Sequence, residues 1–382
     1  MPNKKLYIIA GEESGDNIGS KMIKAIYKKA SDTEIKGVGG TKMVKQGLVS
    51  SFPMQEISLM GFIEIIPHIP NLLKRINQTV DEILDFNPDS VVTIDSPGFN
   101  YRVAKKLKKK GFKGKLIHYV APTVWAYKES RALKTAKIFD KLLCILPWEL
   151  PYFEKHGLDT KFVGHPIFED IQLLKAKEKQ DVRKNYLIKK DDIVITCLIG
   201  SRAGEVERFA EIYAEALRLI EKKHENIKVF ILSTDSMKPF IQKFLQDFPK
   251  NTAIITEQGE KHKLLQISNA AIVKSGTVGL EVASYKCPHA ICYKVSWLSY
   301  KMIKAMVKID LVNLVNISAN SKIIPELIQD DMTAANISKT ICGLLENPDL
   351  AKLQVERSQT ELKKMGLGKK QKPSEIAASE VF

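Results

Sequence analysis

A short polar turn, Ser275-Gly276-Thr277, separates two apolar stretches of the sequence. The residues before it are typical of a strand and those after it of a helix. Such a turn presents backbone N–H groups at a helix N-terminus, where phosphate oxygens could approach the backbone at Gly276. Glu281, one turn further along, could accept hydrogen bonds from ribose hydroxyls. The pattern is equally typical of a helix that Ser275 or Thr277 merely caps.

A second candidate is Gly200-Ser201-Arg202, which follows the strand predicted at 193–198. Arg202 at the end of a strand could extend over the crevice in which α/β proteins bind ligands. Its guanidinium could neutralise a diphosphate whose charge grows as it leaves. An ion pair between domains is the alternative.

In the first half of the chain, acidic residues follow two predicted strands. Residues 11–16, with the sequence GEESGD, form a glycine turn flanked by acids directly after the first strand. Because acidic groups repel phosphate, this turn suits a hydroxyl-bearing acceptor better than a nucleotide. Asp95, after the strand at 90–94, is our candidate for a general base that takes a proton from such a hydroxyl. It could instead form an Asx-turn or helix cap before Pro97.

His118 and Trp125 lie near the end of a third predicted strand, 116–120. A single histidine in an apolar strand is more often a core residue than a catalyst. The same alternative applies to His165, which lies near the junction of the two halves.

Composition limits the function classes. The chain has 382 residues, 44% of them hydrophobic, and no apolar run long enough to span a bilayer. The apolar run near the N-terminus is too short for a signal peptide, so we expect a cytoplasmic protein. Five cysteines without metal-ligand spacing predict buried free thiols.

The net charge of +15 predicts affinity for a polyanion, either nucleic acid or an anionic lipid surface. Eight basic residues and no acidic one lie between Arg102 and Lys115. A second set recurs at the spacing of one helical face: Lys128, Arg131, Lys134, Lys137 and Lys141. A solvated helix surface is the alternative.

Strands and amphipathic helices alternate in two successive sets, which predicts an α/β fold of two Rossmann-like parallel-sheet domains. We expect the first domain at 1–173, a linker at 174–192 and the second domain at 193–348. A helix at 349–365 could pack back on the first domain, and the tail 366–382 is expected to be disordered.

Several motifs are absent from the sequence. It lacks a Walker P-loop, an HExxH motif, zinc-type Cys/His spacing and an Asp-x-Asp motif. The glycines at 37–40 lack the pattern of a dinucleotide fingerprint. We therefore expect neither a metal nor a cofactor.

Taken in order, the motifs resemble those of the lipid-A-disaccharide synthase family. The similarity covers roughly residues 6–345. The matching segments are 10–16 (AGEESGD), 60–64 (MGFIE), 94–100 (IDSPGFN), 118–126 (HYVAPTVWA), 164–166 (GHP), 200–202 (GSR), 275–277 (SGT) with Glu281, and 315–316 (VN).

The resemblance implies a GT-B fold, with two Rossmann-like domains facing across a cleft. It implies an inverting, metal-independent transfer of 2,3-diacylglucosamine from its UDP conjugate to the 6-hydroxyl of 2,3-diacylglucosamine 1-phosphate (lipid X). The products would be a β-1,6 disaccharide 1-phosphate and UDP. The first domain would bind the acceptor and face the membrane, and the second would bind the UDP-sugar.

The resemblance also implies roles for individual residues. The expected catalytic residues are Asp95, Glu12 and His118. The expected UDP-binding residues are Arg202, Ser201, Ser275, Gly276, Thr277, Glu281 and Asn316. Other residues expected at the acceptor or in the cleft are Ser14, Asp16, Asn100, Trp125 and His165.

Four positions depart from the family pattern: Gly98 stands where a second aspartate is common, Ile199 and Val315 replace prolines, and Gly279 replaces an alanine. Gly98 puts in doubt a role shared by two aspartates. We interpret the other three as changes in loop stiffness.

Lipid substrates would explain the charge, since the enzyme would work peripherally at the anionic inner face of the cytoplasmic membrane. Two segments have the composition of membrane-facing surfaces, 52–76 and 297–307; ordinary core packing is the alternative.

The oligomeric state stays open, and a homo-oligomer is one possibility. Other GT-B enzymes, such as a muramyl-type transferase or a UDP-sugar epimerase, are the alternative function. Nucleic-acid binding is not expected, because the basic residues lack interleaved aromatics.

Overall fold

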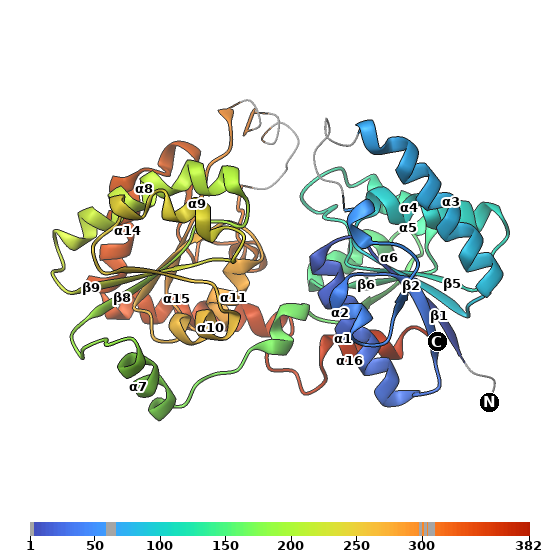
Figure 1. Ribbon diagram of the computed structural model, residues 1–382, viewed down its shortest axis with the longest axis horizontal. Coiled ribbons are helices and arrows are strands. Elements are labelled where there is room, and N and C mark those ends of the chain that lie inside the picture. Colours follow the sequence, from blue (N-terminus) through green and yellow to red (C-terminus); the bar gives the residue numbers. More distant parts are fainter. Residues whose placement is uncertain (1–3, 59–65, 298–299, 302–303, 305–309) are drawn as a thin grey trace. The chain divides into compact units, whose positions relative to one another are not determined.

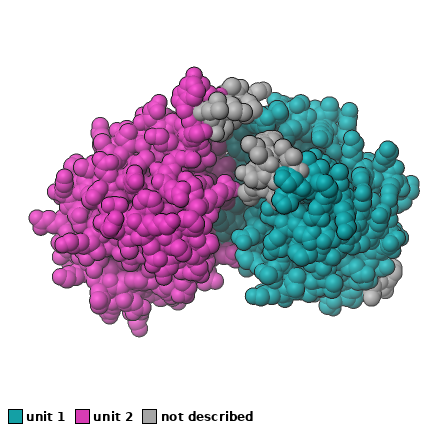
Figure 2. Space-filling model, turned by 45° about the horizontal axis from the view of Figure 1, so that its top comes forward, with its two compact units in different colours: residues 1–169, 368–382 teal, residues 170–367 magenta. Residues whose placement is uncertain are grey.

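The computed structural model describes residues 4–58, 66–297, 300–301, 304 and 310–382. The chain forms two compact units, each built around its own parallel sheet (Figure 1). Unit 1 comprises residues 1–169 together with 368–382, and unit 2 comprises residues 170–367 (Figure 2).

Within the described residues, the sheet of unit 1 has seven parallel strands in the order β3-β2-β1-β4-β5-β6-β7. Leu6 pairs with Ser90, which sets the register of β1 against β4 at the centre of the sheet. The strands are β1 (Lys5–Ala10), β2 (Glu34–Val38), β3 (Val49–Ser50), β4 (Ser90–Ile94), β5 (Lys115–Tyr119), β6 (Lys141–Cys144) and β7 (Asp159–Phe162).

Both faces of this sheet are covered by helices. Tyr7 and Ile9 of β1 point into one core and Leu6 and Ile8 into the other, as the two-residue period of a strand requires. The first core is closed by α3 (Ile69–Phe86), α4 (Pro97–Lys109), α5 (Arg131–Ile138) and α6 (Leu150–Glu154). The second is closed by α1 (Glu13–Lys29), α2 (Thr41–Val44) and α16 (Pro373–Ser379).

Unit 2 has six parallel strands among the described residues, in the order β10-β9-β8-β11-β12-β13. They are β8 (Ile193–Leu198), β9 (Ile227–Leu232), β10 (Thr252–Ile255), β11 (Ala270–Lys274), β12 (His289–Tyr293) and β13 (Glu326–Ile328). One face is covered by α8 (Ala203–Glu221), α9 (Lys238–Gln242) and α14 (Ala334–Glu346). The other carries α10 (Gln258–Leu265), α11 (Val278–Ser284), α13 (Leu314–Ala319) and α15 (Pro348–Lys364) (Figure 1).

The predicted fold class is confirmed: both halves are Rossmann-like α/β domains with parallel sheets. The strands predicted at 90–94 and 193–198 have those bounds in the structure. The segment expected to be a linker contains a helix. Residues 174–192 contain α7 (Ala176–Asn185), and Tyr186, which follows it, donates a hydrogen bond to Glu260 of unit 2 at 2.9 Å. This segment therefore belongs to unit 2.

The expectation of a disordered tail is wrong. Residues 373–379 form α16, and Ala377 and Val381 are fully buried against α1 and β1. Polar contacts also hold this segment, since both Ser374 N–H and Oγ–H donate to the carboxylate of Glu169 at 2.7 and 2.8 Å. The preceding helix, α15, packs on α11 and α13 within unit 2.

The two segments expected to face a membrane are only partly described. Residues 59–65, which include the MGFIE motif, lie outside the described residues, as do 298–299, 302–303 and 305–309. In the first segment, Phe52, Met54, Ile57 and Ile76 are buried and are core residues, as the alternative proposed. Ile69 and Leu73 of the same segment are exposed, by 42% and 47%, so the expectation stays open for them. In the second, Trp297 is 67% exposed, with the Lys301 ammonium 4.0 Å from its ring centroid. Within the described ranges, none of the helices combines the length and apolar composition that crossing a bilayer requires.

Candidate active site

A pocket of about 280 Å³ lies at the carboxyl ends of the unit 2 strands. We call it the strand-end pocket. Parallel strands end at the same edge of a sheet, so the loops after β8, β9 and β11 all meet there. It is lined by Leu198, Gly200, Ser201, Leu232, Ser233, Thr234, Gln258, Lys261, Leu265, Lys274, Ser275, Gly276, Thr277, Val278 and Glu281.

The Ser275-Gly276-Thr277 turn forms one wall of this pocket, as expected for a ligand-binding turn. Gly276 has φ of 148°, which favours glycine. Apart from its two chain neighbours, no described residue has an atom within 4 Å of where a Cβ would stand. The space over Gly276 is therefore open to a ligand. Neither Ser275 nor Thr277 caps α11 with its side chain, since no side-chain cap hydrogen bond forms at this helix among the described residues. The capping alternative is wrong.

Glu281 also lines the pocket, but its carboxylate already has partners. Its Oε1 lies 2.7 Å from Nε2 of His262 and accepts a hydrogen bond from Gln258 at 3.3 Å. Both partners come from α10, and sequence reasoning missed them because a polar helix of eight residues has no motif that marks it. The pair fixes the direction in which the carboxylate of Glu281 points.

Two lysines that sequence reasoning also missed line the pocket. Lys261 donates a hydrogen bond from Nζ to the carbonyl of Ser233 at 3.0 Å, and burial lowers its pKa. The hydroxyl of Ser233 is buried and has no hydrogen-bond partner among the described residues. A buried hydroxyl without a partner is unfavourable, so a polar ligand group in the pocket would stabilise it.

The second of these lysines, Lys274, is held by Glu205. Its Nζ lies 2.9 Å from Oε1 of Glu205, whose other oxygen accepts the N–H of Ser201 at 3.1 Å. Gly200 is required beside them, because a Cβ there would lie 2.6 Å from Oε2 of Glu205. This network joins the loop after β8 to the end of β11.

Arg202 is less central than the sequence suggested. Its side chain is 64% exposed and lies 3.9 Å from Glu205, and it is not among the residues that line the pocket. Lys274, rather than Arg202, is the cation directly beside the Ser275 turn in this structure.

Asn316 has a structural role, contrary to its expected place in the UDP site. It is fully buried, its Nδ2 donates to the carbonyl of Ile324 and to Glu326, and its Oδ1 accepts the N–H groups of Ile323 and Ile324. With every group of the amide engaged by protein, Asn316 holds the loop before β13.

Gly279, which replaces the alanine of the family pattern, is explained by side-chain packing rather than by loop stiffness. A Cβ at Gly279 would lie 2.7 Å from Nδ2 of Asn313. The side chain of Asn313 therefore occupies the volume that an alanine methyl would take.

In unit 1, the turn after β1 contacts the loop after β4. A Cβ on Gly11 would lie 2.5 Å from Oγ of Ser96, so only glycine allows this approach. Asp95 and Ser96 both have positive φ, 48° and 43°, which is unusual for residues with side chains. Asn100 holds this strained loop by donating from Nδ2 to the carbonyls of Ile94 and Asp95.

Asp95 has the properties of a proton acceptor. It is half-buried, and burial raises the pKa of its carboxyl, an effect that a hydrogen bond from the Ser96 backbone partly offsets. Glu12 directly precedes α1 and is half-buried, and Ser14 is exposed on the first turn of that helix. The structure thus brings the acidic turn and the Asp95 loop together.

Asp16 is a structural residue instead of an acceptor ligand. It is buried, and its two oxygens accept the N–H groups of Gly40, Lys42 and Met43 at 2.9 to 3.0 Å. The carboxylate therefore holds the start of α2 against α1.

His118 and His165 are core residues, as the alternative for each proposed. His118 is 1% exposed, its Nδ1 lies 2.7 Å from Oγ1 of Thr93, and its ring stacks on Phe139 at 4.8 Å. Burial lowers the pKa of His118 to about 3 and that of His165 to about 4. Both rings are neutral near pH 7, and the structure does not support catalysis by His118.

Trp125 packs edge-to-face on Trp148, with ring centroids 6.0 Å apart. Beside Trp148 lies a carboxyl that sequence reasoning missed, Glu149, which is 1% exposed and accepts the N–H groups of Ile145 and Leu146. Burial raises the pKa of Glu149 to about 8, although the Leu146 N–H acts to lower it. Glu149 therefore stabilises the loop after β6 in its protonated form.

Comparisons with known proteins agree with this architecture. The lipid-A-disaccharide synthetase family model matches residues 6–381. The chain is 42% identical over 376 residues to the lipid-A-disaccharide synthase of Rickettsia akari, covering 98% of this chain and 94% of that protein. The chain belongs to the lipid-A-disaccharide synthase family. It is therefore a glycosyltransferase.

Solved structures show the fold. A UDP-GlcNAc 2-epimerase from Neisseria meningitidis, bound to UDP-GlcNAc, matches with a TM-score of 0.64 at 14% identity, over 98% of each chain. MurG from Acinetobacter baumannii matches with a TM-score of 0.58 at 12% identity, over 99% of each chain. These neighbours confirm the GT-B fold. At such identities they do not favour the alternative of an epimerase or a muramyl-type transferase over the family match.

Glu149 predicts a pH dependence of stability. Its pKa of about 8 in the folded protein exceeds the ordinary value of 4.5, so unfolding releases a proton between these pH values. The free energy of unfolding should fall as pH rises from 5 to 8, by roughly 2–4 kcal/mol from this residue. In Glu149→Gln that contribution should vanish, as measured by urea unfolding across this pH range.

The control for this prediction is Glu154→Gln on neighbouring α6, where Glu154 is exposed. It should keep the wild-type slope of unfolding free energy against pH. A Glu149→Gln variant with the same slope as wild type would show that Glu149 is ionised in the fold.

Proposed function

We propose that this enzyme transfers 2,3-diacylglucosamine from its UDP conjugate to the 6-hydroxyl of 2,3-diacylglucosamine 1-phosphate (lipid X). The products are a β-1,6-linked disaccharide 1-phosphate and UDP. The observation that carries the proposal is the family match over residues 6–381, together with a strand-end pocket whose lining suits a nucleoside diphosphate.

UDP binds in the strand-end pocket of unit 2. Its diphosphate lies at Gly276, where a ligand can approach the backbone, and Lys274 and Lys261 neutralise its charge. Glu281, oriented by His262, accepts hydrogen bonds from the ribose hydroxyls. Arg202 is exposed and adds positive charge outside the pocket.

Asp95 is the general base of an inverting transfer. The proton of the acceptor 6-hydroxyl passes to the Asp95 carboxylate as that oxygen forms its bond to the anomeric carbon. The bond from this carbon to the β-phosphate breaks at the same time, and its electron pair leaves with UDP. A raised pKa makes Asp95 a stronger base than an ordinary aspartate, and the cations of the pocket stabilise the charge that develops on UDP. No step requires a metal.

A basic groove of about 550 Å³ on unit 1, between α4 and α5, binds the membrane surface. Its floor includes Leu133, which is 43% exposed, and Ile138. Five lysines surround it: Lys105, Lys108, Lys109, Lys134 and Lys137. A cationic groove with an apolar floor complements an anionic lipid surface, to which each lysine near the surface contributes about 1 kcal/mol.

Replacing the base tests the chemistry. Asp95→Asn should lower kcat roughly 100-fold or more, because general base catalysis typically contributes at least that much. Its affinity for UDP should not change. The assay is disaccharide formation from UDP-2,3-diacylglucosamine and lipid X, with UDP binding measured by calorimetry.

Asp85→Asn, at an exposed position on α3, serves as the control and should keep wild-type kcat. Near-normal turnover by Asp95→Asn with intact UDP binding would exclude Asp95 as the base. Wild-type turnover should also persist in EDTA, and its loss without unfolding would contradict a metal-independent reaction.

The pocket lysine tests the nucleotide site. Lys274→Met should weaken UDP binding roughly 10- to 100-fold, since a hydrogen bond to a charged group contributes about 1.5–3 kcal/mol. Lys263→Met is the matched control, because Lys263 pairs with Glu260 and is not a lining residue. Equal UDP affinities for both variants would place the diphosphate elsewhere.

Charge reversal tests the basic groove. The double variant Lys134→Glu, Lys137→Glu should sediment with vesicles containing phosphatidylglycerol at least about 10-fold less than wild type, since two attractive charges become repulsive. The control, Lys177→Glu with Lys184→Glu on α7, has the same net charge at exposed positions of unit 2. Equal losses in both variants would mean that net charge alone, and not the groove, binds the vesicles.

A further inference from the structure

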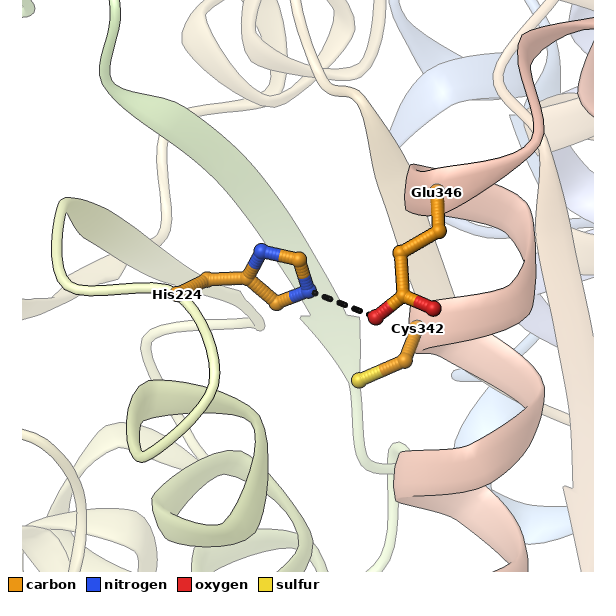
Figure 3. A group of neighbouring side chains, drawn as sticks. All are labelled: His224, Cys342 and Glu346. Carbon is orange, nitrogen blue, oxygen red and sulfur yellow. Dashed lines mark ion pairs between the residues drawn. The ribbon is translucent and has the colours of Figure 1, made fainter.

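Three side chains with metal-binding atoms converge in unit 2, at the end of the sheet opposite the strand-end pocket. His224 follows α8 and precedes β9, so it lies where the strands begin. Cys342 and Glu346 are one turn apart in the last turns of α14, which packs alongside α8. The imidazole of His224 points at the carboxylate of Glu346, with the thiol of Cys342 beside them (Figure 3).

The donor atoms are close enough to share one ion. Nε2 of His224, Sγ of Cys342 and a carboxylate oxygen of Glu346 all lie within 4.8 Å of one another. Nε2 of His224 lies 3.4 Å from Oε1 of Glu346. In a tetrahedral zinc site, with zinc–donor distances of about 2.0–2.3 Å, the donors lie roughly 3.5 Å apart. Small side-chain movements would therefore bring all three within bonding distance.

The surroundings leave these donors available. Nε2 of His224 is buried and has no partner with hydrogen-bond geometry among the described residues. Cys342 is 2% exposed and is a free thiol. Glu346 is 56% exposed, so its carboxylate can move and the fourth coordination position can hold water. A buried nitrogen that makes no hydrogen bond is unfavourable, and a metal bond would satisfy it.

We propose that His224, Cys342 and Glu346 bind one zinc ion, which links the carboxyl ends of α8 and α14. A sulfur, a nitrogen and one carboxylate favour zinc over magnesium or calcium, which take oxygen ligands. The partial negative charge at the two helix ends also favours a cation. On binding, the thiol of Cys342 loses its proton to solvent, and the imidazole coordinates in its neutral form.

This site is separate from the proposed transfer reaction, which uses the other end of the sheet. Its predicted effect is on the stability of unit 2, because an ion that binds only the folded state stabilises it. Binding can therefore be measured without any substrate.

The test uses the full-length protein in a phosphine reductant, treated with EDTA that is then removed. Cobalt(II) is the spectroscopic probe. One equivalent should give a thiolate-to-cobalt charge-transfer band and the visible bands of a tetrahedral site, and zinc should displace it. Zinc should also raise the melting temperature of the wild-type protein.

Three variants remove one donor each. Cys342→Ser should abolish the charge-transfer band, and His224→Gln and Glu346→Gln should each weaken cobalt binding roughly 10-fold or more, since loss of even an outer-shell partner has an effect of this size. Cys287→Ser, at another buried cysteine of unit 2, and Glu211→Gln, at an exposed position on α8, are the controls and should bind as wild type.

Glu346→Gln keeps the test decisive if Cys342→Ser does not fold, because Glu346 is largely exposed. A wild-type protein without a thiolate band would overturn the proposal, and so would cobalt binding that none of the three substitutions weakens. A zinc-induced rise in melting temperature that persists in Glu346→Gln would place the ion at other residues.

Discussion

Both sheets are parallel and covered by helices on both faces, so polar side chains that act on a ligand can stand only where the strands end. All strands of a parallel sheet end at the same edge, and every loop that leaves this edge is brought next to its neighbours. In unit 2 this brings together Gly200, Ser233 and Gly276, which follow three different strands. In unit 1 it places Gly11 against Ser96. The candidate chemistry of both units depends on this constraint.

Burial then separates the residues that can react from those that hold the fold. His118 and His165 lie inside the core of unit 1 and are neutral, while Asp95 stands at the strand end with its carboxyl half-buried. Asp16 and Asn316 lie in family motifs, but each has its polar atoms engaged by protein groups. A residue of a family motif can therefore have a structural role, because it holds the loop on which a residue of the active site stands.

Charged side chains of the unit 2 pocket hold one another in place around the proposed anion site. Glu205 does not oppose the positive character of the pocket, because it lies behind Lys274 and fixes the position of that ammonium. The same carboxylate binds the N–H of Ser201 and limits the neighbouring position to glycine. On the other side, His262 holds Glu281. Lys274 and Glu281 are therefore each oriented by a second charged or polar group.

The sequence alone determined the fold class, the order of most strands, and the turns at Ser275 and Asp95, because strand and helix periodicity and glycine turns are local properties. Shorter elements escaped it. β3 has only two residues and β13 three, and α16 has seven, of which only Ile376, Ala377 and Ala378 form a short apolar run after a lysine-rich stretch. These elements are stable because a neighbouring sheet or helix covers them. Such contacts between distant segments cannot be predicted from a local sequence pattern.

Only the tertiary structure decided which polar residues share a site. Lys261 and Lys274 had no motif to mark them, and they line the pocket because α10 lies beside it and β11 ends there. His262, also on α10, contacts the lining residue Glu281. The same holds for His224 with Cys342, which are more than a hundred residues apart in the sequence. Residue types and local turns are written in the sequence, whereas proximity, burial and hence protonation arise when distant segments pack together.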